Sequence, residues 1–239
     1  MKSLRQIPNA PHDAVPFLRK SKGGSHRVCV IVYKPEGAVV SKRVFDRCWE
    51  YSPHGGGYAV WDGSRWVYEK GFMDKDEFYK AVKGLIHSRH TRVVLHFRLA
   101  TEDAKGNKNI LPEFTHPFEI QLQDTKALLF VNGRFSESYE GVVGAPKVKK
   151  FVEDINRLKL KRWQYEKLLA EDGLLEGLLQ HGGERARLLT LFEEDKQPFF
   201  SPKPPKGWVK HGGLWLSKDI FRLWSFGGVG YTTWWEVWI

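Results

Sequence analysis

Long hydrophobic runs and cysteines are both scarce in this sequence. No apolar run approaches the roughly 18 residues of a membrane span, and the first residues lack the apolar core of a signal peptide. Cys29 and Cys48 are the only cysteines, too few for a disulfide framework. We therefore expect no membrane segment, free thiols and a reducing compartment, with the cytoplasm as the simplest choice.

Motifs for bound metals, nucleotides and nucleic acids are also missing. The chain has no zinc, calcium or P-loop signature and no helix-turn-helix, zinc-finger or ribonucleoprotein motif. His54 and His116 have no metal-ligand partner at a recognisable spacing. The sequence therefore predicts neither a metal nor a cofactor.

Acidic residues are outnumbered by basic ones. The 239 residues include 28 Asp and Glu against 38 Lys and Arg, a formal net charge of +10. The basic residues cluster at 19–22, 147–150, 159–162 and 203–210. Such an excess favours a polyanion or an acidic protein as partner, although solubility and unstructured basic tails are the simpler explanation.

Tryptophan, by contrast, is abundant. The chain has ten, and six of them follow residue 206. Residues 232–239 alternate as in a β-strand, with Trp234 and Trp238 on one face and Trp235 on the other. We expect this segment to lie in the core or at an interface rather than to form a ligand platform.

Apolar periodicity divides the chain into three parts. Residues 1–28 carry prolines and charges without a sustained period and are predicted to be a basic N-terminal extension or leader. Residues 29–200 form the main domain, and residues 201–239 either complete it with Trp-rich strands or form an interface.

The same periodicity predicts the secondary structure of the main domain. Strands are expected at 28–33, 58–61, 65–68, 93–95, 118–122, 127–131 and 187–192, and helices at 44–49, 75–86, 148–169 and 174–179. Asp62-Gly63 forms a hairpin turn between two of the strands, because this dipeptide tolerates positive φ. The order of elements predicts an α+β fold with two antiparallel sheets packed face to face and flanked by helices.

Several short motifs occur in a particular order. They are Cys29 within the apolar run 28–33, the segment 52–59 (SPHGGGYA), the segment 96–101 (HFRLAT), His116-Pro117, Asn132-Gly133 at the end of a strand, and more weakly the segment 213–217 (GLWLS). Together they resemble the glutaminase domain of class II glutamine amidotransferases, members of the N-terminal-nucleophile (Ntn) hydrolase superfamily. The resemblance covers roughly residues 29–220. It implies a four-layer αββα sandwich and an activity that releases ammonia from glutamine.

The resemblance also assigns roles to individual residues. Cys29 would be the nucleophile that attacks the side-chain amide. Arg98 would bind the α-carboxylate of glutamine through its guanidinium group. The side-chain amide of Asn132 and the backbone N–H of Gly133 would form the oxyanion hole. Two further residues would support substrate binding beside them, Thr101 and His116.

Two departures from the family pattern bear on activity. In the superfamily the nucleophile is the first residue, and its α-amine, with a pKa of about 7.7–8.0 in unperturbed form, is the base. Here residues 1–28 precede Cys29, so activity requires cleavage between Val28 and Cys29. The family's Asp for the substrate ammonium has no counterpart, since the matching segment 144–148 contains Lys147 instead. A degenerate, inactive relative is therefore an alternative.

Other functions remain open. Compact stand-alone domains of this type occur in bacteriophage genomes, which suggests a non-enzymatic virion or host-interaction protein, located in the host cytoplasm or the virion. A nucleic-acid-binding protein is a weaker alternative, based on the positive charge and interleaved aromatics. Most of the site residues also have a structural explanation: Cys29 as a small buried side chain, Arg98 in an ion pair, His116 as an exposed or core hydrogen-bonded side chain, and Asn132-Gly133 as a hairpin turn.

Overall fold

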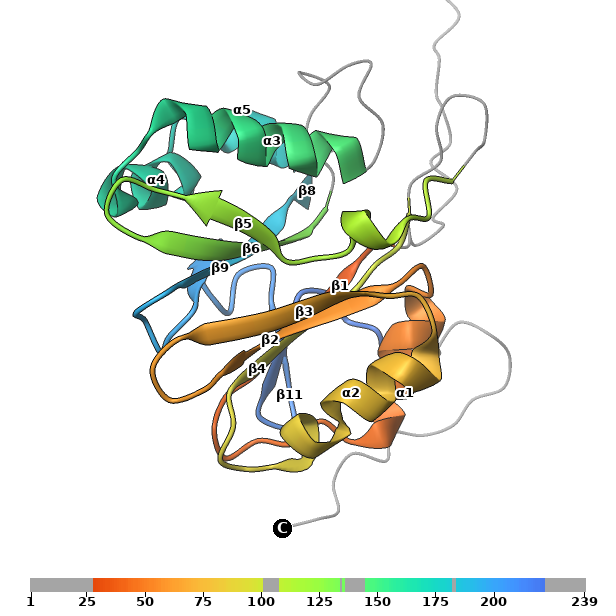
Figure 1. The fold of residues 1–239 in the computed structure, drawn as a ribbon. Helices are drawn as coiled ribbons and strands as arrows, with labels where there is room; N and C mark the ends of the chain where they lie inside the picture. The colour runs from red at the N-terminus through yellow and green to blue at the C-terminus, as the bar shows by residue number, and fades with distance from the viewer. Residues whose placement is uncertain (1–27, 101–107, 134, 136–144, 182–183, 222–239) are drawn as a thin grey trace, which may run out of the picture.

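The computed structural model describes residues 28–100, 108–133, 135, 145–181 and 184–221 (Figure 1). Three expectations from the sequence lie outside these residues: the structure of the extension preceding Val28, the position of Thr101, and the Trp-rich segment 232–239. Within the described part, the chain folds as an α+β protein with two antiparallel sheets, as predicted.

The first sheet has six strands. In order across the sheet they are β11 (Val209–His211), β12 (Leu214–Leu216), β1 (Val30–Lys34), β4 (Val93–Phe97), β2 (Gly56–Trp61) and β3 (Trp66–Phe72), and all neighbours are antiparallel. The central strands β1 and β4 are buried at every residue. Their continuous apolar runs are typical of strands that are covered on both faces.

The second sheet has four antiparallel strands. Their order is β10 (Phe199–Ser201), β9 (Arg187–Phe192), β6 (Lys126–Asn132) and β5 (Phe118–Gln121). A short ribbon of β7 (Gln180–His181) and β8 (Glu184–Arg185) and a 3-10 turn, η1 (Pro112–Phe114), complete the described strands and turns.

Two helices, α1 (Lys42–Tyr51) and α2 (Lys75–His87), cover one face of the first sheet (Figure 1). The Ser41 hydroxyl accepts a hydrogen bond from Val44 N–H (3.3 Å), and the Asp74 carboxylate accepts two from the first turn of α2. Both are N-caps that satisfy donors left free at a helix start. The apolar stripe predicted for 75–86 is buried in this cluster, as Phe78, Val82 and Ile86 show.

Three helices pack on the second sheet: α3 (Ala145–Leu158), α4 (Arg162–Leu169) and α5 (Glu176–Leu179) (Figure 1). The prediction of one helix over 148–169 is wrong, because the chain breaks at Lys159, whose φ is +47°. The break turns α4 so that Tyr165 is fully buried and bonds Thr190 of β9 (3.0 Å). The helix predicted at 174–179 is reduced to its last turn, α5.

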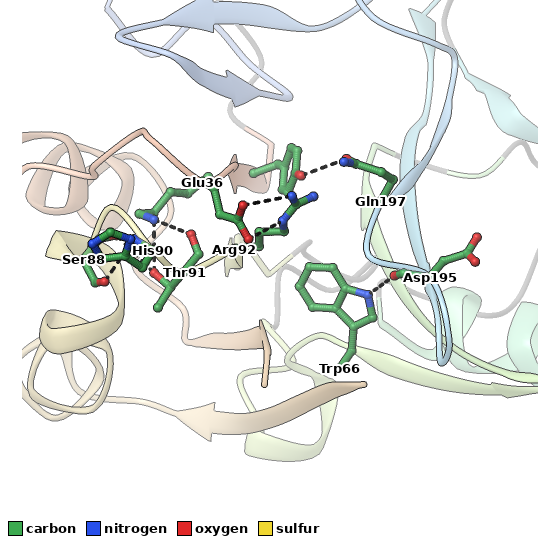
Figure 2. Close-up of polar contacts among 10 residues, drawn as sticks. Glu36, Trp66, Ser88, His90, Thr91, Arg92, Asp195 and Gln197 are labelled. Carbon is green, nitrogen blue, oxygen red and sulfur yellow. Dashed lines mark hydrogen bonds and ion pairs between the residues drawn. The ribbon is translucent and has the colours of Figure 1, made fainter. Parts of the chain in front are cut away.

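A third cluster of apolar side chains fills the space between the two sheets. It contains Ile31 and Val94 from the first sheet and Phe130 and Leu189 from the second, all fully buried. At the end of β1 that is far from Cys29, polar contacts also join the sheets. Trp66 Nε1–H donates to the Asp195 backbone oxygen (2.6 Å), and Tyr33 OH donates to Gln197 Oε1 (3.3 Å) (Figure 2).

The chain from 209 to 216 is an integral part of the first sheet. β12 pairs with β1 at Val32–Leu216 and Tyr33–Trp215, and β11 continues the sheet beyond it. This pairing brings the segment 213–217 beside the strand that follows Cys29. In the described part of the chain, no helix is both long and apolar enough to cross a membrane.

Candidate functional site

Cys29 lies directly before β1, and the register of the sheet places it beside the HFRLAT segment. β1 pairs with β4 from Val30 opposite Phe97 onward, so Cys29 falls next to the residues that follow β4. Its Sγ accepts a hydrogen bond from Leu99 N–H (3.3 Å), and Leu99 O lies 3.7 Å away. Cys29 and Leu99, which are 70 residues apart in sequence, thus meet through strand pairing.

Arg98 is buried, with only 3% of the residue exposed. It donates to the backbone oxygens of His54 (3.5 Å) and Asn109, and its guanidinium carbon lies 5.9 Å from the centroid of the Phe114 ring. No carboxylate of the described residues forms an ion pair with it, so the structural explanation of Arg98 as half of an ion pair has no support there. Burial lowers the pKa of Arg98, but a guanidinium stays charged in proteins. A desolvated cation of this kind is suited to binding an anion.

Opposing effects determine the pKa of the Cys29 thiol. Burial of the thiol raises its pKa above the ordinary value, while the Leu99 N–H and the positive charge of Arg98 oppose this rise. Burial dominates, so the pKa is raised overall. A thiol is a poor nucleophile until it loses its proton, and this site therefore needs a base.

The segment 52–57 is tied to Arg98 by its backbone. His54 N–H donates to Arg98 O (2.9 Å), and Arg98 N–H donates to Gly55 O (2.8 Å). His54 Nδ1 accepts from Ala100 N–H (2.9 Å), which fixes the remaining proton of the neutral ring on Nε2. Gly55 has φ +113°, a conformation that favours glycine. The SPHGGGYA and HFRLAT motifs therefore form one structural unit.

Asn132 is fully buried at the end of β6 and is linked through Ser217 to the strand that follows Cys29. Its Nδ2 donates to Ser217 Oγ (2.7 Å) and to Ser217 O (3.1 Å), so both amide hydrogens are used. Ser217 Oγ also accepts from Ile31 N–H (2.8 Å), and Ser217 N–H donates to Ile31 O (3.0 Å). Asn132 thus lies near the nucleophile's strand, but its amide is directed at Ser217 in this structure.

Gly133 occupies a position that only glycine tolerates. Its φ is +137°, and a Cβ there would lie 2.8 Å from Ala186 Cα. Asn132-Gly133 is not a hairpin turn, because both edges of β6 are already paired, with β5 and with β9. Gly133 therefore packs closely against Ala186, directly after the end of β6.

His116 packs against His96 with ring centroids 4.0 Å apart and the ring planes tilted by 36°, and both residues are almost completely buried. His96 Nε2 lies 3.1 Å from Val131 O, next to Asn132. Burial lowers the pKa of His96 to about 3 and that of His116 well below its usual range, so both rings are neutral at physiological pH. In the described chain, no three His, Cys, Asp or Glu side chains converge as metal ligands would.

Sequence reasoning missed the roles of two serines. Ser52 Oγ–H donates to Val28 O (2.9 Å), the carbonyl immediately before Cys29, and Ser217 joins Asn132 to β1. Both serines belong to motifs found in the sequence, SPHGGGYA and GLWLS, but no local pattern shows what their hydroxyl groups contact.

A cavity of about 300 Å³ lies away from the predicted site residues, none of which lines it. Its lining comes from β3, β5, β6, β9, α3 and adjoining turns, and consists of Trp66, Tyr68, Glu119, Ile120, Gln121, Lys126, Ala127, Leu128, Asn156, Leu191 and Glu193. The Tyr68 hydroxyl donates to Glu119 (3.0 Å) at this cavity.

Comparisons of the sequence with protein-family models, with curated proteins and with solved structures find no match.

Proposed function

We propose that this protein is a class II glutamine amidotransferase-like amide hydrolase, with Cys29 as its nucleophile. The observation that carries this proposal is the position of the thiol. Cys29 Sγ accepts from Leu99 N–H (3.3 Å) and feels the positive charge of the adjacent residue Arg98, which is buried and pairs with no described carboxylate. A nucleophile next to an unneutralised, desolvated cation fits a substrate that carries both an amide and a carboxylate.

The fold that we propose with this function is the four-layer αββα sandwich of the Ntn hydrolases. Its support is the placement of helices on the outer faces of two antiparallel sheets, with an apolar cluster between the sheets (Figure 1). In that architecture a nucleophile at the start of a central strand lies at the edge of the interface between sheets. Cys29 directly precedes β1, a central strand of the first sheet, which supports this comparison.

Each residue has a chemical task in this proposal. Cleavage before Cys29 frees an α-amine, whose pKa of about 7.7–8.0 in unperturbed form allows it to remove the thiol proton at neutral pH. Arg98 binds the carboxylate of the substrate. Gly133 N–H and the Asn132 amide stabilise the oxyanion, which requires Asn132 to exchange at least one bond to Ser217 for the substrate.

The test combines intact mass with covalent labelling. A diazoketone analogue of glutamine is expected to add once to the cleaved protein, at Cys29. The Cys29→Ser variant should remain unlabelled, and Cys48, which is fully buried in α1, is the internal control thiol. Arg98→Met should lower the labelling rate by about 100-fold, since a charge-assisted bond contributes about 1.5–3 kcal/mol. Labelling of Cys29 by a neutral alkylating agent but never by the analogue would refute a glutamine site.

The second candidate is a non-enzymatic relative that retains the fold and binds a partner. The observation in its favour is Asn132, whose two amide hydrogens are both held by Ser217. An uncleaved chain that neither hydrolyses glutamine nor reacts with the analogue, yet co-purifies with a defined partner through its basic extension, would favour this candidate.

A further inference from the structure

The Val28 carbonyl, which belongs to the peptide bond before Cys29, has a side-chain donor in contact with it. Ser52 Oγ–H donates to Val28 O at 2.9 Å. Ser52 is fully buried at the C-terminus of α1, where its N–H donates to Cys48 O (3.0 Å) and Trp49 O (3.1 Å). The helix end therefore holds the hydroxyl group in place against the carbonyl.

The other groups around this peptide bond suit a cleavage reaction. The Cys29 thiol is attached one residue beyond the Val28 carbonyl, so its attack closes a small ring. Leu99 N–H donates to the sulfur, and this contact and the positive charge of Arg98 favour the thiolate against the opposing effect of burial. A hydroxyl hydrogen bond to a carbonyl oxygen becomes stronger as that oxygen gains negative charge in a tetrahedral intermediate.

We propose that Ser52 is a catalytic residue for self-cleavage of the Val28–Cys29 bond. Cys29 Sγ adds to the Val28 carbonyl carbon, the thiol proton passes to the Cys29 nitrogen, and the C–N bond breaks to leave a thioester and a free α-amine. Water then adds to the thioester carbonyl and the C–S bond breaks, which yields a Val28 carboxylate and the restored thiol. Ser52 donates to the same oxygen in both steps.

Asn132 does not supply this donor, because its amide hydrogens are directed at Ser217. The chain thus has separate donors for two reactions: Ser52 for removal of its own extension, and the Asn132-Gly133 pair for the later substrate. This inference rests on the proposed function, since cleavage is the step that would free the amine of Cys29.

The experiment follows the intact mass of the purified full-length chain over time. The matched pair is Ser52→Thr and Ser52→Val, since threonine keeps the hydroxyl group and valine has nearly the same shape without it. We expect Ser52→Thr to cleave within about tenfold of wild type and Ser52→Val to cleave about 100-fold to 1,000-fold more slowly, as for loss of one oxyanion donor. Cys29→Ala should stay intact. Ser41→Ala, which removes the N-cap serine at the other end of α1, is the control for helix stability and should cleave at the wild-type rate.

The outcomes separate the two proposals. Equal rates for Ser52→Thr and Ser52→Val would overturn the role of Ser52 alone, whereas a folded wild-type chain that stays intact would overturn both proposals. If the pair differs as expected but the cleaved product neither hydrolyses glutamine nor reacts with its analogue, Ser52 keeps its role and the proposed function fails. If cleavage is independent of Ser52 while the product reacts with the analogue, the reverse holds. Hydroxylamine added during the reaction should intercept the thioester and speed cleavage of Ser52→Thr.

Discussion

The reactivity of Cys29 is decided by the residues that surround its sulfur. Burial raises the pKa of the thiol, and Leu99 N–H and Arg98 lower it. The nearby residues that determine these effects come from the end of β4, not from the apolar run that contains Cys29. For the same reason the second thiol differs: Cys48 is fully buried within α1, and burial alone raises its pKa.

Alkylation of Cys29 should therefore depend on pH in a defined direction. Because its pKa is raised above the ordinary value, the thiolate fraction and the rate should still be rising with pH where an exposed cysteine, with a pKa of about 8.5, is already levelling off. Arg98→Met removes a charge that lowers the pKa, so it should move the profile to higher pH. Peptide mapping after iodoacetamide treatment measures the rate, with Arg65→Met on the exposed hairpin as control. An Arg98→Met profile at lower pH would contradict this assignment.

Gly57 is a second position where a single substitution is expected to have a large effect, here on the stability of the fold. A Cβ at Gly57 would lie 2.1 Å from the backbone oxygen of His116. Gly57→Ala should therefore lower the free energy of unfolding by about 3 kcal/mol, because backbone must move to relieve the clash. Gly84→Ala is the matched control: nothing lies within 4 Å of its Cβ position in α2, so it should stabilise by about 1 kcal/mol. Urea unfolding measures both, and equal effects would refute the close approach.

At the scale of elements, β1 is held on both edges and from across the sheet interface. β4 and β12 pair with its edges, and Asn132 of β6 reaches it through Ser217. The result is that three strands, distant in sequence, fix the start of the strand that follows Cys29.

Ser217→Ala should weaken this junction. The substitution leaves the Ile31 N–H and one Asn132 amide hydrogen without their acceptor in a fully buried place. The free energy of unfolding should fall by about 2–4 kcal/mol, since each buried unsatisfied group costs about 1–3 kcal/mol. Ser64→Ala, on the exposed hairpin turn, is the control and should change it by less than about 0.5 kcal/mol. A loss no larger than the control in chemical denaturation would show that water replaces Ser217.

At the scale of the whole molecule, the two sheets are joined by an apolar cluster and by polar contacts at one end. Trp66 is 6% exposed and bonds Asp195, which also pairs with Arg162 of α4. Figure 2 shows Trp66 directed toward Asp195, and the same view includes the ion pair between Arg92 and Glu36. These contacts link the first sheet to the turn after β9.

Trp66→Phe should lower the free energy of unfolding by about 2–3 kcal/mol, because it removes the hydrogen bond to Asp195 and part of a buried ring. Trp163→Phe is the control, since Trp163 is 60% exposed and its change should stay within about 0.5 kcal/mol. Thermal unfolding followed by far-UV circular dichroism measures both variants. Equal midpoints for the two would show that Trp66 contributes nothing to the junction between the sheets.

The sequence by itself determined the elements whose signals are local. The apolar stripe at 75–86 predicted α2, and Asp62-Gly63 predicted the turn between β2 and β3, where Gly63 has φ +113°. The order of strands and helices predicted an α+β fold with two antiparallel sheets, which is confirmed. These predictions succeed because side-chain periodicity and turn chemistry act within a few residues.

Only the tertiary structure determined which residues come together at the site. The helix predicted over 148–169 ends at Leu158 because burial of Tyr165 against β9 requires the chain to turn. The pairing of β12 with β1 brings Ser217 to Ile31, 186 positions away in sequence, and to Asn132. The contact of Ser52 with Val28 O joins residues 24 positions apart. No local pattern encodes such contacts, because they depend on how the sheets and helices pack together.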